Sequence, residues 1–189
     1  MLLRGEFYDA GPIDRGARRR ALQLDPDRLT GLVLFGGQGS KAMVGIAKRL
    51  PDTQLILACG HNESLVRALR ALPARVPRLV LGFTFNVAWY MAFADFFVGK
   101  PGPGSLSEAV QMNLPVVVVR NRATMPQERY NTQWVRDHGV GMVLPSFTGT
   151  ADAVDRLSGQ WDQVPCRDAG RSQSRGVRVA GNPGTDSGA

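Results

Sequence analysis

The chain has 189 residues, a hydrophobic content of 43% and a formal net charge of +7. This length fits one domain with loose ends, and no apolar run approaches the ~20 residues of a membrane span. The N-terminal residues lack the apolar core of a signal peptide, so the sequence predicts a cytoplasmic protein.

The positive charge is concentrated between residues 31 and 150 rather than in either flank. Such a domain can attract a nucleotide diphosphate, nucleic acid or an anionic membrane, which allows peripheral contact with the inner face of the cell membrane. Nucleic acid is not expected as a partner, because zinc-finger spacing, a ribonucleoprotein aromatic motif and a continuous basic stripe are all absent. Cys59 and Cys166 are expected to be free thiols.

Taken in order, the chain divides into three parts. Residues 1–30 form a lead-in or linker, in which Arg15 to Leu22 is predicted to be a short basic helix. Residues 31–158 form the globular domain. Residues 159–189 contain scattered Arg, Ser, Gly and Pro with few aliphatic side chains, which indicates a disordered tail.

Within the globular part, short apolar strands alternate with helical segments. Strands are predicted at 32–35, 54–59, 78–81, 95–98, 115–119 and 142–144, and helices at 40–50, 63–72, 86–94, 105–112, 127–138 and 150–157. Continuous apolar strands between helices indicate an α/β, Rossmann-like fold with a parallel sheet covered by helices on both faces. Ligands of such sheets bind outside the carboxyl ends of the strands.

Two glycine-rich turns follow strands at this binding edge. The first is Gly36 to Ser40, whose serine is predicted to cap the next helix, and the second is Gly99 to Gly104. Glycine allows close approach of the backbone to a ligand, and a helix start offers unpaired N–H groups to an anion. We therefore expect a phosphate-bearing ligand between the helix starts near residues 105 and 127.

Polar residues near these two helix starts have two interpretations each. Ser105 and Glu108 fit a capping box, and Gln127 stands three residues after Thr124, where it can act as a capping partner. Alternatively, Glu108 accepts hydrogen bonds from the hydroxyls of a ribose. In the same way, Gln127 with Glu128 and Asn131 offers the donors and acceptors that a sugar requires.

The histidines and cysteines do not predict a metal site. His61 is either a ligand contact or a solvated loop residue, and His138 is expected to end its helix. The two histidines and two cysteines do not cluster in sequence. No nucleophile–base pair for covalent catalysis is visible either.

The segment GFTFNVAWYMAFADFFVGKPGPGSLSEAVQMNLPVVV, followed by PQERYN, resembles the donor-binding C-terminal domain of MurG-type glycosyltransferases, glycosyltransferase family 28. It is most similar to the branch of monogalactosyldiacylglycerol synthases and diacylglycerol glucosyltransferases. The resemblance extends from about Arg4 to about Leu144. It implies one half of a two-domain GT-B enzyme that transfers a hexose from a UDP-sugar with inversion, usually without a bound metal. The UDP-sugar is a co-substrate, and no cofactor is implied.

Matched positions imply a set of donor-binding residues. Near the diphosphate the resemblance implies Gly37, Gly39, Ser40, Gly102, Gly104 and Ser105. Near the base and ribose it implies His61, Asn62, Gly82, Phe83 and Glu108. Near the sugar or its phosphate it implies Gln127, Glu128 and Asn131.

The family's N-terminal domain, which binds the acceptor lipid and supplies the catalytic base, has no counterpart in this sequence. A lipid acceptor such as diacylglycerol would therefore be held by a missing domain or a partner chain, and no catalytic residue is assigned. Three alternatives stay open: the donor-binding subunit of a two-chain N-acetylglucosaminyltransferase, a nucleotide-sugar epimerase, and a non-catalytic UDP-binding module.

Overall fold

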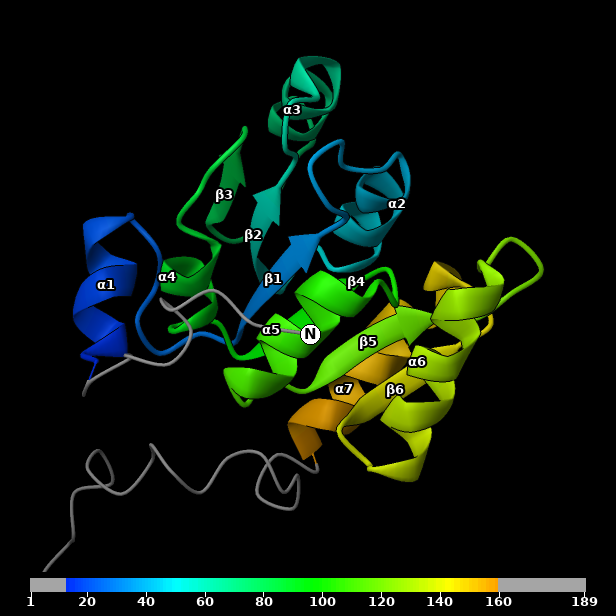
Figure 1. The fold of residues 1–189 in the computed structure, drawn as a ribbon. Helices are drawn as coiled ribbons and strands as arrows, with labels where there is room; N and C mark the ends of the chain where they lie inside the picture. Colours follow the sequence, from blue (N-terminus) through cyan, green and yellow to red (C-terminus); the bar gives the residue numbers. More distant parts are fainter. Residues whose placement is uncertain (1–12, 160–189) are drawn as a thin grey trace, which may run out of the picture.

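The computed structural model describes residues 13–159. The predicted tail and Cys166 lie outside this range, apart from Gly159. The described chain forms a six-stranded sheet in the order β3-β2-β1-β4-β5-β6, with every neighbouring pair parallel (Figure 1). The strands are β1 (Thr30–Leu34), β2 (Gln54–Ala58), β3 (Arg78–Leu81), β4 (Phe96–Gly99), β5 (Val116–Val119) and β6 (Gly141–Leu144).

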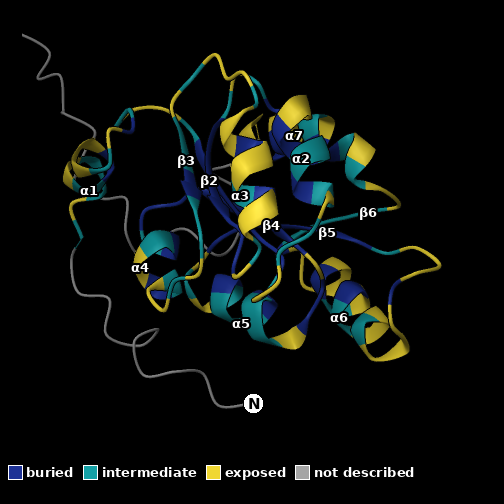
Figure 2. Ribbon diagram, turned by 90° about the horizontal axis from the view of Figure 1, so that it is seen from above, coloured by how far each residue is buried: buried dark blue, intermediate teal, exposed yellow. Residues whose placement is uncertain are grey.

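Helices cover both faces of this sheet (Figure 2). They are α1 (Arg15–Ala21), α2 (Ala42–Arg49), α3 (Glu63–Arg70), α4 (Val87–Met91), α5 (Pro103–Gln111), α6 (Pro126–Asp137) and α7 (Thr150–Gly159), with a 3-10 turn, η2 (Phe147–Gly149). One core cluster joins the sheet to α2, α3 and α7, and the other joins it to α4, α5 and α6. The expected α/β fold, with a parallel sheet covered on both faces, is confirmed.

Alternation along the strands explains the continuous apolar runs. In β1, Val33 belongs to the cluster of α2, α3 and α7, whereas Leu32 and Leu34 belong to the opposite cluster. Because both faces are covered, every residue of β1, β2, β4 and β5 is buried. The pattern that predicted the strands is therefore a direct result of two-sided burial.

The lead-in helix α1 is confirmed and is attached through buried ionic contacts. Arg19 donates to the carboxylate of Asp95 at 2.7 Å and to the carbonyls of Phe93 and Pro26. The same carboxylate accepts the amide of Thr30 at 2.8 Å. Asp95 and Arg19 are each only 5% exposed, so α1 is fixed to the edge from which β1 and β4 start. The boundary proposed at residue 31 stays a prediction.

Helix starts differ from the sequence-based expectation at two places. Helix α5 begins at Pro103 rather than Ser105, because a proline fits the first turn and Gly102 precedes it as the N-cap. Ser105 is then the third helical residue, so the capping box with Glu108 is wrong. Helix α2 begins at Ala42 rather than Ser40, although the Ser40 hydroxyl accepts the amide of Ala42 at 3.2 Å.

The other elements agree with their predicted positions to within a few residues. Helix α4 is shorter than the predicted helix at 86–94, because it begins at Val87 and ends at Met91. His138 caps the C-terminus of α6, as expected, with its Nδ1 2.9 Å from the carbonyl of Trp134. No helix between residues 13 and 159 combines the length and apolar character that crossing a bilayer requires.

Candidate functional site

The strand order places a crevice beside the centre of the sheet. Strands β1 and β4 are neighbours, but the helix after β1 covers one face and the helix after β4 covers the other. The loops that leave these two strands therefore diverge, which opens a binding position at their carboxyl ends. A cleft of about 490 Å³ lies there, lined by residues from the loops after β1, β2, β3 and β4 and by the first turn of α6.

Two glycines near the cleft are required by packing. Gly39 and Gly60 have φ angles of +60° and +62°, which side chains rarely adopt. A Cβ at Gly39 would lie 2.7 Å from the carbonyl oxygen of Cys59, and one at Gly60 would overlap the backbone of Gly37. The amide of His61 also donates to the Gly37 carbonyl at 2.8 Å. These glycines hold the loops after β1 and β2 together.

Two other glycines leave open space towards the cleft. A Cβ at Gly37 would meet no atom within 4 Å, and one at Gly82 would lie 3.9 Å from its nearest neighbour, the Gly60 carbonyl. Both residues line the cleft. Packing does not require glycine at either position, so the missing side chains leave room for a ligand against the backbone.

The N-terminus of α5 faces the same space. Gly102 caps the helix without a side-chain hydrogen bond, and no described group accepts from the amides of Gly104 and Ser105. Gly102, Gly104 and Ser105 all line the cleft, as does Glu108 one turn further into the helix. Unpaired amides and the positive end of the helix dipole favour an anion here.

Lys100 is a cleft residue that the sequence did not identify. It follows β4 directly, and its Cε lies 3.8 Å from a Cβ built on Gly36 and 3.3 Å from one built on Gly102. It thus stands between the two glycine turns, and it is the only basic side chain among the described residues that line the cleft. The signal available in the sequence was a lysine directly after an apolar strand and before a glycine turn.

The start of α6 separates its three predicted sugar-contacting residues. Glu128 lines the cleft, with Oε1 3.5 Å from a Cβ built on Gly102. The Asn131 amide donates to the carbonyl of Pro101 at 2.8 Å, which ties α6 to the loop after β4. Gln127 is exposed, with Nε2 3.7 Å from the Met125 sulfur. The alternative that pairs Gln127 with Thr124 as a cap is not formed, because Met125 is the N-cap.

Aromatic side chains stand at the opposite end of the cleft. Phe83 stacks on His61 with ring centroids 4.0 Å apart and an interplanar angle of 16°. Phe85 meets Phe83 edge-on at 4.8 Å, and the two phenylalanines are 45% and 74% exposed. An exposed aromatic face at the mouth of a cleft offers a stacking surface to a planar group.

The remaining predicted residues support the loops rather than line the cleft. Asn62 caps α3 by accepting the amide of Leu65 at 3.0 Å, and it donates to the Gln38 carbonyl at 3.3 Å. Eight predicted residues line the cleft: Gly37, Gly82, Phe83, Gly102, Gly104, Ser105, Glu108 and Glu128. Six do not: Gly39, Ser40, His61, Asn62, Gln127 and Asn131. Lining residues absent from the predicted set include Gly36, Gly60, Thr84, Phe85, Val87, Lys100 and Pro103.

Between residues 13 and 159, no group of three or more His, Cys, Asp or Glu residues is arranged to hold a metal ion. The expectation that donor binding needs no metal or cofactor stays a prediction.

Comparison with known proteins gives a consistent family. Residues 32–157 match the Glycosyltransferase family 28 C-terminal domain. A probable monogalactosyldiacylglycerol synthase 3 of Oryza sativa subsp. japonica is 34% identical over 152 residues, which are 75% of this chain and 30% of that protein. A processive diacylglycerol beta-glucosyltransferase of Staphylococcus carnosus is 32% identical over 141 residues, 71% of this chain and 36% of that protein. The chain thus spans about a third of the length of these curated relatives.

Solved structures share the fold at low identity. MurG of Acinetobacter baumannii superposes with a TM-score of 0.58 and 18% identity, over 85% of this chain and 47% of that one. HepE of Anabaena, solved in complex with UDP-glucose, superposes with a TM-score of 0.60 and 16% identity, over 84% of this chain and 46% of that one.

Proposed function

The chain belongs to glycosyltransferase family 28, matching its C-terminal domain, and on this premise we propose that it binds the UDP-hexose donor of a glycolipid-forming hexosyltransferase. The observation that carries this proposal is the N-terminus of α5, which has no side-chain cap and opens into a cleft whose glycines leave room for a ligand. The sequence relatives are glycolipid synthases, and HepE, which shares the fold, was solved with UDP-glucose.

Each part of the donor has a matching part of the cleft. The diphosphate lies between the amides of Gly104 and Ser105 and the Lys100 ammonium, because these groups offer positive charge and hydrogen-bond donors. Uracil stacks at the aromatic end near Phe83, and the ribose hydroxyls reach Glu108. The hexose then extends towards Glu128 at the start of α6.

The chemical role of this half is stabilisation of the leaving group. In an inverting transfer, the acceptor oxygen forms a bond to the anomeric carbon as the bond from that carbon to the UDP oxygen breaks. Negative charge develops on the departing diphosphate, where the α5 amides and Lys100 stabilise it. The acceptor hydroxyl must lose its proton to a base held in line with the sugar, and we assign that base to the acceptor half.

We assign the acceptor to the diacylglycerol class of lipids. The support is the identity of two relatives, a probable monogalactosyldiacylglycerol synthase and a diacylglycerol glucosyltransferase. Since this chain spans about a third of their length, the acceptor-binding half belongs either to a further part of the same protein or to a partner chain.

Calorimetric titration of the purified chain with UDP, and with ADP and GDP as controls, tests the proposal. We expect UDP binding that is weakened by roughly tenfold, about 1.4 kcal/mol, in Glu108→Ala. Equal binding of all three nucleotides would contradict the assignment of uracil to the aromatic end. UDP-galactose, UDP-glucose and UDP-N-acetylglucosamine, titrated in turn, rank the hexoses.

Turnover separates this proposal from its rivals. Addition of an acceptor half and diacylglycerol should give glycolipid from the bound donor. A two-chain N-acetylglucosaminyltransferase would instead use UDP-N-acetylglucosamine with another acceptor. An epimerase would interconvert UDP-hexoses without any acceptor. A non-catalytic UDP-binding module would show no turnover, whether or not the acceptor half and the lipid were added.

A further inference from the structure

The β4–α5 loop, residues 100–102, is weakly fixed by backbone hydrogen bonds. Proline at positions 101 and 103 leaves no N–H to donate at either position. Between residues 13 and 159, no backbone–backbone hydrogen bond involves Lys100 or Pro101. The Gly102 carbonyl accepts only the amide of Leu106, at 3.2 Å, which belongs to the first turn of α5. The loop therefore needs other contacts to hold one conformation.

One side-chain hydrogen bond supplies such a contact. Asn131 Nδ2 donates to the carbonyl of Pro101 at 2.8 Å, across 30 positions of sequence. Pro101 and Gly102 are buried, and a buried carbonyl without a donor destabilises the conformation that contains it. In the described part of the chain, the Asn131 amide is the only group that forms a hydrogen bond with Pro101.

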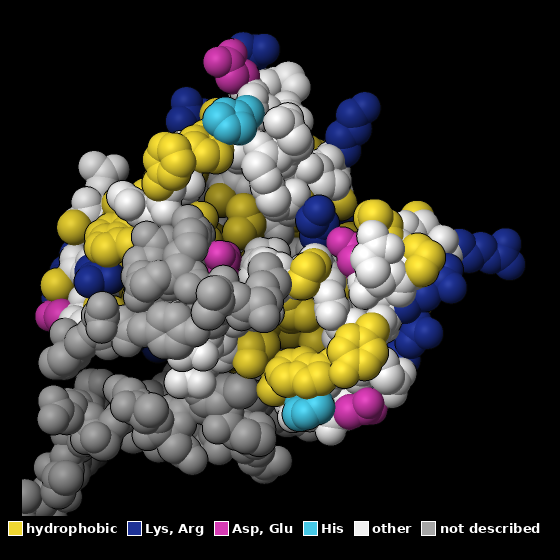
Figure 3. Space-filling model, in the orientation of Figure 1, with side chains coloured by type: hydrophobic (Ala, Val, Ile, Leu, Met, Phe, Trp, Pro, Cys, Tyr) yellow, Lys and Arg dark blue, Asp and Glu magenta, His cyan; other side chains and the backbone are white. Residues whose placement is uncertain are grey.

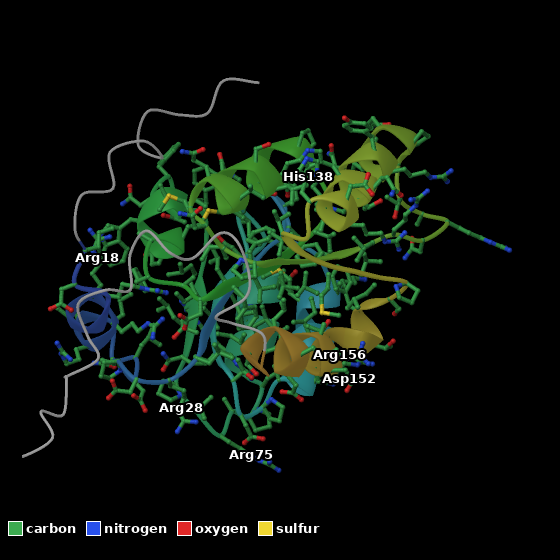
Figure 4. The ribbon with its side chains drawn as sticks, turned by 90° about the horizontal axis from the view of Figure 1, so that it is seen from below. Arg18, Arg28, Arg75, His138, Asp152 and Arg156 are labelled. Carbon is green, nitrogen blue, oxygen red and sulfur yellow. The ribbon has the colours of Figure 1, made fainter. Side chains whose placement is uncertain are left out.

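Helix α6 is a firm support for this amide. Val135 is fully buried in the core cluster that joins the sheet to α4, α5 and α6. The C-terminus of α6 is capped by His138, whose ring stacks on Trp134 with centroids 4.2 Å apart. Figure 4 labels His138, at the end of the helix away from Asn131. Because both its middle and its end are packed, α6 can fix the position of a loop that contacts its first turns.

The start of α6 meets the β4–α5 loop at a second point. Glu128 precedes Asn131 by three residues, so their side chains share one face of the helix. Glu128 Oε1 lies 3.5 Å from a Cβ built on Gly102, the residue next to the carbonyl that Asn131 binds. The loop is thus packed against α6 at two adjacent residues.

The β4–α5 loop forms part of the cleft, whereas Asn131 does not. Lys100 and Gly102 both line the cleft, and the loop leads directly into the first turn of α5. In Figure 3 the surface is hollowed above α5, between the loops that follow β1 and β3, where the cleft opens. A change at Asn131 can therefore alter the cleft through the loop that it holds.

We propose that Asn131 is a positioning residue of the donor site and acts through the Pro101 carbonyl. While the loop is held, the Lys100 ammonium and the amides at the start of α5 face one anion together. Donors that are ordered before binding lose less conformational entropy when the ligand arrives. The inference rests on the proposed function for the identity of that anion, the diphosphate, but not for the order of the loop.

Backbone amide relaxation, measured by NMR on the nucleotide-free chain, tests the order of the loop. In Asn131→Ala we expect the order parameters of the Lys100 and Gly102 amides to fall from about 0.85 to below about 0.6. The order parameter of Gly39, in the other glycine turn, should stay unchanged. Alanine has a higher helix propensity than asparagine, so the substitution does not weaken α6 itself.

The matched control is Gln133→Ala, which removes an amide side chain from an exposed position of the same helix. Gln133 Nε2 donates to Asp137 at 2.7 Å, within α6, rather than to the loop. This variant should leave the order parameters of the loop and the affinity for UDP unchanged. Unchanged loop order in Asn131→Ala, or an equal loss of order in Gln133→Ala, would overturn the inference.

Calorimetry with UDP and UDP-glucose separates positioning from direct contact with the hexose. Asn131→Ala should weaken both ligands by the same factor, about tenfold, because both carry the diphosphate. A contact between Asn131 and the hexose would instead weaken UDP-glucose alone, and that result would overturn the inference. If the unaltered chain binds no UDP, the donor-site proposal fails, and the relaxation comparison still decides whether Asn131 orders the loop.

Discussion

At the scale of single residues, glycine has two different roles around the cleft. Gly39 and Gly60 are required because their φ angles are positive and neighbouring backbone leaves no room for a Cβ. Gly37 and Gly82 face open space in the cleft, so packing does not require glycine there, and we propose that they admit the ligand. The sequence alone does not distinguish these glycines, because the difference depends on which atoms lie opposite each one in the fold.

Substitution separates the two roles. Gly37→Leu should fold with an unchanged melting temperature but lose UDP affinity by about tenfold or more, because the new side chain occupies the cleft. Gly60→Ala should instead lower the free energy of unfolding by on the order of 1–3 kcal/mol, through strain at positive φ and a clash with Gly37. Calorimetry and thermal unfolding measure the two effects. If Gly37→Leu bound UDP with unchanged affinity, Gly37 would not border the UDP-binding site.

Lys100 provides a test of the diphosphate position. Lys100→Gln should weaken UDP by about tenfold and leave uridine affinity unchanged, because uridine carries no phosphate. Lys48→Gln removes the same charge from an exposed position on α2 and serves as the control. Equal weakening of UDP and uridine would show that Lys100 shapes the cleft without contacting the diphosphate.

Cys59 is buried and unpaired, and burial raises the pKa of its thiol from 9.0 to about 11. In a Cys166→Ser variant, the remaining thiol should therefore not react with a disulfide reagent until the chain unfolds. Since the unfolded thiol loses its proton at lower pH than the folded one, this thiol stabilises the fold below pH 9.0, and that contribution declines as the pH rises towards about 11. Rapid labelling of the native chain at neutral pH would contradict this.

At the scale of elements, the strands were predictable and the helix starts were less so. Two-sided burial produces apolar runs such as Val116–Val119, which no other element imitates at that length. Helix starts depend on which of several nearby groups caps the first turn. Ser105 is a typical N-cap residue and therefore predicts a helix start at that position. Proline also fits the first turn of a helix, and α5 begins two residues earlier, at Pro103.

The ion pair between Arg19 and Asp95 attaches helix α1 to the sheet, and substitution of Arg19 tests how much it stabilises the fold. Arg19→Met should lower the free energy of unfolding by about 3 kcal/mol, because it leaves the buried Asp95 carboxylate with fewer donors. Arg18→Met, on the same helix, loses only a contact of its guanidinium 5.2 Å above the Trp89 ring and should cost less than about 1 kcal/mol. Urea unfolding measures both. Equal effects would mean that the buried pair adds nothing to stability.

At the scale of the whole molecule, the sequence predicted the sheet edge at which the cleft opens but not the set of residues that meet there. Strand β1 lies beside β4, and this pairing brings Lys100 close to Gly36. Strand β2 lies beside β3, with Ala58 opposite Leu81, and this pairing brings the rings of His61 and Phe83 together. No local sequence pattern predicts which strands are neighbours, so the predicted set of site residues does not include Lys100. The side chains of Asn62 and Asn131 bond backbone groups of this chain, and their contact with a ligand stays a prediction.

In the donor-site proposal, the UDP-sugar binds in the cleft between β1 and β4. An amide NMR titration of the chain with UDP tests this binding position. We expect the largest saturable shifts at Gly37, Gly82, Gly104 and Ser105, with little change at Gly45 and Gly149, which do not line the cleft. Saturable shifts that spare the α5 amides and appear elsewhere would contradict the claim.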